Sequence, residues 1–337
     1  MNRRIALLLV AGLLAGMTFA VASPARALEA GCRATDRGYR CLYPMTINYD
    51  GMTEVFELVE SPGVPGFITS ARATLIDDAG RRIGHHMAHL HHAVWVNPQK
   101  QDLACPEWPD RFFGSGRERT PMRLPDGYGY EVGANDWGFT AHVDGMHSGH
   151  PGTFEAFIRL DLGFAPADSG LTDIAPVWFS VTGECDTDAE FDVPRTGSRY
   201  TESDVWRATE TGRFIAAAGH LHDGGLSLKL RNTTTKESIF TSQALYERRP
   251  RDYWYLTGMT SFARTPGVAV DQGDDLRLTA AYDGGRRRQD VMGIMLGAFV
   301  AGEEPTGSAD AVSAPERRCL ALDDFLKEVV PRFLLVG

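Results

Sequence analysis

The histidines of this chain occur in only three short segments, although the chain has 337 residues. Half of the 10 lie in "GHHMAHLHHAVWVNP" (84–98), and the others lie in "FTAHVDGMHSGH" and "GHLHDGG". They are His85, His86, His89, His91, His92, His142, His147, His150, His220 and His222. Neutral imidazole is a common ligand for copper and zinc, and ordinary packing does not explain such clustering. The distribution therefore predicts metal binding.

The motif "GHLHDGG" has the spacing of a two-histidine ligand set. Side chains two positions apart on a strand project to the same face, so His220 and His222 can present two imidazoles to one ion. The later segment "QDVMGIMLGAFV" offers Met292 or Met295 as a third ligand. A thioether is a soft ligand that suits Cu(I) better than zinc. Two histidines and a methionine therefore predict a copper site that passes through the reduced state.

His91 and His92 are adjacent, and this spacing imposes a structural condition. Neighbouring residues of a strand point to opposite faces, so sharing one ion requires a bulge or a strand end at this pair. A third imidazole is available from His142, His147 or His150. A site with three histidines suits copper and zinc equally well.

Each pattern has an ordinary explanation when it is taken alone. A single H-x-H is common on surfaces, a histidine-rich run is also typical of metal-scavenging tracts, and methionine in an apolar strand usually packs in the core. Three isolated clusters in one chain favour metal binding over these explanations.

The elements that must position these residues are strands. The segments 154–164, 225–232 and 275–284 alternate apolar and polar residues with period two, and 71–83 is typical of a hairpin. The pattern predicts an all-β fold of two tandem jelly-roll (β-sandwich) domains, at 28–190 and 191–302. The polar segment 183–204 is the expected linker. The range 303–337 is expected to hold a loose stretch followed by a short C-terminal helix at 321–330.

The N-terminal segment 1–27 is typical of a signal peptide. It has the basic start "MNRR", an apolar run and a small-x-small site that ends at Ala27. We therefore expect an exported protein, secreted or periplasmic, with no membrane segment after cleavage. The net charge of −10 argues against nucleic acid and anionic membranes as partners.

The 5 cysteines suit the oxidising compartment that export implies. Cys32 and Cys41 bracket a short turn-rich segment and are placed to bridge each other. The pairing of Cys105, Cys185 and Cys319 stays open, and one thiol is left over. There is no G-x-S-x-G motif or phosphate-binding loop, which argues against a serine hydrolase or a nucleotide-binding protein.

Four motifs in a fixed order carry a family resemblance. They are "LHHAVWVNP", "RFFGSGRERTPMRLPDGYGYEVG" followed by "MHS", "GHLHDGG" and "DVMGIML". In this order they resemble the copper type II, ascorbate-dependent monooxygenases, the group of peptidylglycine α-hydroxylating monooxygenase and dopamine β-monooxygenase. The resemblance extends over about 43–300 and, with the signal segment, indicates a bacterial exported member.

The resemblance implies two jelly-roll domains with one copper ion each. It assigns one copper to His91, His92 and His147, with His142 as the alternative third ligand, and the other to His220, His222 and Met292, with Met295 as the alternative. The second copper would activate O₂ and abstract hydrogen from a substrate C–H bond, and the first would deliver an electron from a reductant such as ascorbate. No side-chain general base is required.

The chain departs from the peptide-hydroxylating pattern at three positions. Ala218, Ile294 and Leu296 stand where that enzyme has arginine, asparagine and tyrosine, which predicts a smaller or more apolar pocket than one for a peptide C-terminus. We expect a monooxygenase that hydroxylates a small molecule with O₂ and an external electron donor. The alternative is a non-catalytic copper-binding protein for storage, delivery or sensing. The additional His85, His86 and His89 favour that alternative, because catalysis does not need them.

Overall fold

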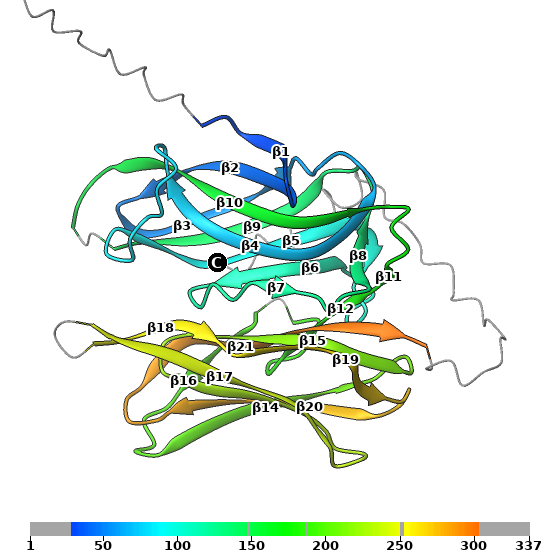
Figure 1. Cartoon of the computed structure of the whole chain (residues 1–337). Helices are drawn as coiled ribbons and strands as arrows, with labels where there is room; N and C mark the ends of the chain where they lie inside the picture. Colours follow the sequence, from blue (N-terminus) through cyan, green and yellow to red (C-terminus); the bar gives the residue numbers. More distant parts are fainter. Residues whose placement is uncertain (1–27, 147–148, 187, 250–252, 303–337) are drawn as a thin grey trace, which may run out of the picture.

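The computed structural model describes residues 28–146, 149–186, 188–249 and 253–302. Within these ranges every regular element is a β-strand, which confirms the predicted all-β fold. The strands form two pairs of sheets, one pair above the other in Figure 1. The signal segment 1–27 and the predicted C-terminal helix lie outside the described residues. No helix in the described part of the chain has the length and hydropathy needed to cross a membrane.

The first pair of sheets contains β1 to β11 and is called the first half (Figure 1). One sheet has the strand order β1-β2-β10-β4-β8-β11, with β7 beside β4, and the other has the order β3-β9-β5-β6. The bounds are β1 Gly31–Thr35, β2 Gly38–Asn48, β3 Asp50–Val59, β4 Gly66–Asp77, β5 Ala88–Gln101, β6 Pro109–Gly116, β7 Met122–Arg123, β8 Tyr128–Val132, β9 Trp137–Met146, β10 Thr153–Pro166 and β11 Thr172–Asp173.

The second pair contains β12 to β21 and is called the second half. Its sheets have the orders β12-β21-β15-β19, with β13 beside β21, and β14-β20-β16-β17-β18. The bounds are β12 Ala175–Ser180, β13 Glu190–Val193, β14 Arg199–Arg207, β15 Gly212–Leu221, β16 Gly225–Asn232, β17 Ser238–Arg249, β18 Tyr253–Met259, β19 Ser261–Val270, β20 Asp275–Asp283 and β21 Arg288–Ala301.

The chain passes between the halves earlier than the polar segment 183–204 suggests. β12 falls within the range 28–190, yet it pairs with β21 along its whole length. β13 also pairs with β21, so the polar loop between β12 and β13 connects two strands of the same sheet. Only Ile174 lies between β11 and β12, so no linker composition marks the passage.

Each half has an apolar core between its two sheets, and the core of the first half continues onto Ile215, Ala216 and Ala298 of the second half. In the first half, the period-two pattern of β10 buries Ala156, Ile158, Leu160 and Leu162 against the facing sheet, which includes the fully buried Trp95. In the second half, rings of Phe179, Phe214 and Phe299 form the centre of the core. Full burial of one such large apolar side chain contributes about 1.5–3 kcal/mol. These cores hold the strands that carry the histidines.

Two disulfides are present among the described cysteines. Cys32–Cys41 joins the neighbouring strands β1 and β2, which confirms the expected local pair. Cys105–Cys185 joins the loop after β5 to the loop after β12 and so ties the first half to the second. Cys319 lies outside the described residues. Disulfides of this kind indicate an oxidising environment.

Candidate metal centre

His91 and His92 project into the same region because β5 is irregular at this point. The register between β5 and β9 shifts between Leu90 and His92, so that His91 has no opposite residue in that ladder. A bulge turns a side chain that would otherwise face the other side of the sheet. The two imidazole rings consequently lie 5.2 Å apart between centroids. Of the two arrangements that would let this pair share an ion, a bulge or a strand end, the structure has the bulge.

A third histidine joins this pair from β9. His142 lies opposite His92 in the ladder, and the two ring centroids are 4.1 Å apart. Ligand nitrogens of His91, His92 and His142 all lie within 4.8 Å of one another. These three residues are called the first histidine group. His147, the third ligand preferred from the sequence, lies outside the described residues, and the alternative His142 belongs to the group.

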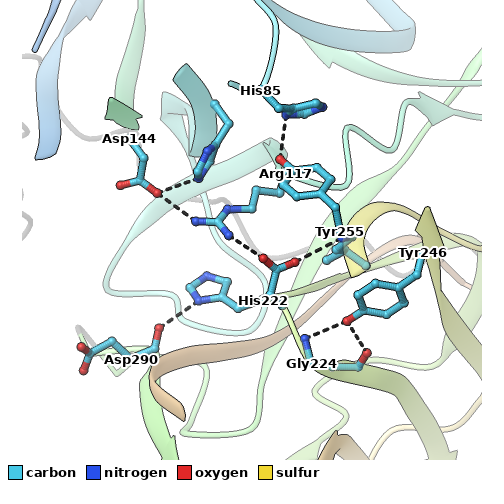
Figure 2. Close-up of polar contacts among 12 residues, drawn as sticks. His85, Arg117, Asp144, His222, Gly224, Tyr246, Tyr255 and Asp290 are labelled. Atoms are coloured by element: carbon cyan, nitrogen blue, oxygen red, sulfur yellow. Dashed lines mark hydrogen bonds and ion pairs between the residues drawn. The ribbon is translucent and has the colours of Figure 1, made fainter. Parts of the chain in front are cut away.

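His220 and His222, the second histidine group, lie at the end of β15. Nδ1 of His222 donates a hydrogen bond to the carbonyl oxygen of Asp290 at 2.9 Å (Figure 2), and Nδ1 of His220 lies 2.9 Å from Oε2 of Glu118. Both Nε2 atoms are buried and have no hydrogen-bond partner among the described residues. Histidines that bind metal have this arrangement, with one ring nitrogen held by a polar group and the other left for the ion.

Met292 and Met295 occupy opposite faces of β21. Met295 is fully buried in the core of the second half, whereas Met292 lines the cavity between the halves. The ladder between β15 and β21 pairs His220 with Ile294, and Met292 lies two positions from Ile294 on the same face of β21. Opposite residues of an antiparallel ladder project to the same face. Met292 is therefore the methionine on the face of the second histidine group.

The two histidine groups are direct neighbours at the contact between the halves. The ring centroid of His91 lies 4.5 Å from that of His222, which is as close as the rings within each group. The family resemblance implies one ligand set in each domain with a cleft between them. In this structure the halves dock so closely that the two sets form one continuous row of imidazoles.

Burial lowers the pKa of these imidazoles, because it removes water from their charged form. The pKa of His91 falls to about 3, and those of His92 and His222 fall well below the usual value. Burial also lowers the pKa of His142. All four imidazoles are consequently neutral near pH 7 and keep a nitrogen lone pair for a metal ion.

A polar network connects the halves beside the histidines (Figure 2). The guanidinium of Arg117, in the loop after β6, lies 2.9 Å from Asp144 and 3.0 Å from Asp223. Oδ2 of Asp144 also lies 2.7 Å from Nε2 of the buried His89. Burial alone would raise the pKa of the Asp144 carboxyl, but His89, His91 and Arg117 together hold this pKa well below its usual range.

The remaining histidines lie outside the two groups. His85 contacts the second half, since its Nδ1 lies 2.7 Å from the hydroxyl of Tyr255 on β18 (Figure 2). His86 and His150 are exposed. His85 and His89 therefore each contact a polar side chain, Tyr255 and Asp144 respectively.

Sequence reasoning missed the polar residues that support the histidines, namely Arg117, Glu118, Asp144 and Asp223. Arg117 and Glu118 lie within a motif that carries the family resemblance, and Asp223 follows the H-x-H directly. No spacing rule connects a loop of one half with a histidine of the other, so only their position in a recognised motif was available as a signal.

A cavity of about 710 Å³ lies between the halves, and its wall includes four of the histidines, His91, His92, His142 and His220. Ala218, Ile294 and Leu296 line it, together with the rings of Trp108, Phe113 and Trp178. The three positions that depart from the peptide-hydroxylating pattern thus face the cavity and make it more apolar. Acidic side chains lie elsewhere on its wall, and burial raises the pKa of Glu184 and Glu190 to about 7.

The donor atoms of the site fit copper. Nδ1 of His91 and of His92, like Nε2 of His220 and of His222, is buried without a hydrogen-bond partner among the described residues. Each unpartnered polar atom in a protein interior costs free energy unless a ligand or water satisfies it. Neutral imidazoles with one thioether form a donor set suited to an ion that alternates between Cu(II) and Cu(I).

Comparison with known proteins gives two similar sequences. The chain is 27% identical over 247 residues to the probable copper-dependent oxygenase clz3 of Cochliobolus lunatus, with 64% of this chain and 73% of that protein covered. It is 27% identical over 237 residues to the probable copper-dependent oxygenase M1 of a Phoma species, with 65% of this chain and 59% of that protein covered. No protein-family model matches the chain.

Among solved structures the similarity is low. The crystal structure of the STIV MCP aligns with a TM-score of 0.35 at 9% identity, over 77% of this chain and 97% of that chain. The structure of infectious bursal disease virus Gx strain aligns with a TM-score of 0.20 at 10% identity, over 79% of this chain and 72% of that chain. Neither value supports an argument about function.

Proposed function

We propose that this chain is an exported copper-dependent oxygenase that hydroxylates a C–H bond of a small organic molecule with O₂ and an external electron donor. His91, His92 and His142 would hold one copper ion, and His220, His222 and Met292 would hold a second. The observation that carries the proposal is the hydrogen bonding of the ring nitrogens in the second histidine group. Each of its histidines has Nδ1 engaged by a polar group and a buried Nε2 left over.

Bound copper would supply the one-electron steps and the reaction with O₂ that side chains lack. The residues of the chain have other tasks. The sulfur of Met292 favours the reduced ion, and the neutral imidazoles provide nitrogen donors without a proton to displace. The aromatic and aliphatic wall around Trp178, Ile294 and Leu296 would exclude water and bind the apolar part of a substrate. The names of the two similar proteins support the same activity.

The positions of His85 and His89, two of the three additional histidines, favour the oxygenase over a copper-storage protein, whereas the third, His86, is exposed. A storage or scavenging function would use accessible imidazoles in excess of the two groups. His89 is buried against Asp144 and its ring centroid lies 6.4 Å from that of Tyr255 of the other half, and His85 contacts the same tyrosine. These two side chains therefore contribute to the contact between the halves instead of forming an additional ligand set.

The proposal is tested by copper loading and O₂ uptake. The purified protein is loaded with Cu(II), freed of unbound metal by gel filtration, reduced with ascorbate and followed with an oxygen electrode. We expect two copper ions per chain and O₂ consumption for the wild type and for Met295→Leu, the control in the core. Met292→Ala should keep the first copper and lose O₂ consumption. Two bound ions without O₂ uptake would indicate a carrier, and a protein free of copper would refute both functions.

A further inference from the structure

We infer that the second histidine group is completed by a residue of the opposite half, with Glu118 of the first half acting as the positioning residue for His220. This inference rests on the proposed copper function. Glu118 follows β6 and is only 5% exposed. Its Oε2 lies 2.9 Å from Nδ1 of His220, and its Oε1 accepts a hydrogen bond from the amide of Gly116 at 3.0 Å. Both carboxylate oxygens are therefore engaged.

The end of β6 is shaped for this contact by two glycines. A Cβ at Gly116 would lie 2.5 Å from Cε1 of His220 and 2.7 Å from Oε2 of Glu118. A Cβ at Gly114, two positions earlier on the same face, would lie 2.6 Å from the ring of Trp178. Real side chains do not tolerate such distances, so any larger residue would separate β6 from β15 and β12. The sequence "GSG" thus permits the close approach that brings Glu118 to His220.

The neighbouring residue holds the same loop against the second half. Arg117 contacts Asp223, which follows the second histidine group directly, and Asp144 of its own half. Two consecutive side chains of the first half therefore contact the segment around the H-x-H. Arg117 forms an ion pair with Asp223, and Glu118 contacts His220.

The two histidines of the second group differ in what orients them. His222 is held by a backbone carbonyl of its own half, at Asp290. His220 is held by the Glu118 carboxylate of the other half. A carboxylate that accepts Nδ1–H keeps the ring in the tautomer with a free Nε2 lone pair, fixes the ring plane and increases its basicity as a ligand. The second copper site is consequently assembled only when the halves are docked.

The test compares Glu118→Ala and Glu118→Gln with the wild type. Glu184→Gln is the matched control, because Glu184 is also a carboxylate of the cavity wall. Copper affinity is measured by competition with a chelator. X-ray absorption of the Cu(I) form reports the sulfur ligand, and therefore the second site alone. We expect Glu118→Ala to weaken one of the two ions about 10- to 100-fold, the range for lost outer-shell partners of metal ligands. Glu118→Gln, which can still accept the hydrogen bond, should lose less, and Glu184→Gln should match the wild type.

A second measurement needs no metal. Long-range ¹H–¹⁵N correlation spectra of the copper-free protein, assigned with His220→Gln, should show His220 in the Nδ1–H tautomer in the wild type and a changed tautomer ratio in Glu118→Ala. Circular dichroism shows whether each variant is folded. Unchanged copper affinity, sulfur signal and tautomer in folded Glu118→Ala would overturn the inference. If the wild type binds no copper, and the His220 tautomer still differs between the wild type and Glu118→Ala, the proposed function is refuted and the positioning by Glu118 stands.

Discussion

Removing the charge of Arg117 should loosen the contact between the halves. Its guanidinium is shared by Asp144 at 2.9 Å and Asp223 at 3.0 Å, and the three side chains are 19%, 21% and 24% exposed. Breaking a fully buried ion pair costs about 3–5 kcal/mol, whereas exposed pairs contribute about 0–1 kcal/mol. For this partly buried pair of contacts we expect Arg117→Met to lower the free energy of unfolding by about 2–3 kcal/mol. At an unfolding entropy of about 2.1 cal/mol/K per residue, that loss lowers Tm by roughly 3–5 °C in a chain of this length.

The assay is urea and thermal unfolding of the copper-free protein. Arg81→Met is the matched control, because Arg81 forms an ion pair with Asp77 at 2.9 Å but is 78% exposed. We expect less than about 1 kcal/mol for this control, as for other surface pairs. A double-mutant cycle with Asp223→Asn isolates the contact that crosses between the halves. If Arg117→Met is no less stable than the control, or the cycle shows no coupling, the contact does not hold the halves together.

Three further outcomes are expected. His142→Ala should remove copper from the first histidine group while His147→Ala leaves it bound, as measured by elemental analysis; the reverse would make His147 the ligand. Burial raises the pKa of Asp110 to about 8, so the folded state keeps a proton that the unfolded state releases, and the contribution of this group to stability falls by about 1.4 kcal/mol per pH unit between about pH 4 and pH 8. Asp110→Asn should remove this contribution in urea unfolding, and a pH slope identical to that of the wild type would contradict it. Met295→Ala should cost about 2–5 kcal/mol because Met295 is fully buried, and Met292→Ala should cost less than half of that in the copper-free protein; equal losses would place both side chains in the core.

Local patterns predicted those features that depend on neighbouring residues. The alternation of apolar and polar residues predicted strands, because successive side chains of a strand face opposite sides. The adjacency of His91 and His92 required a bulge or a strand end if the two share an ion, and the register of β5 contains a bulge. The short segment between Cys32 and Cys41 predicted a local disulfide. Each of these inferences needs only the geometry of one strand or one turn.

Choices between equivalent candidates required the tertiary structure. Met292 and Met295 are both possible ligands by residue type, and strand periodicity separates them onto opposite faces without saying which face is the core. The packing of the two sheets of the second half decides this, since it buries Met295. Similarly, only the pairing of β5 with β9 shows that His142 lies opposite His92.

The sequence by itself determined which residue types are concentrated where, and hence the kind of ion they suit. Only the tertiary structure decided that His91 lies beside His222 and that Glu118 holds His220. These contacts join residues far apart in the chain, and they depend on how the two sandwiches dock. Docking depends on the shape and charge of two whole surfaces, including the close approach that Gly114 and Gly116 permit because glycine has no side chain. No short-range pattern in the sequence predicts the complementarity of two such surfaces.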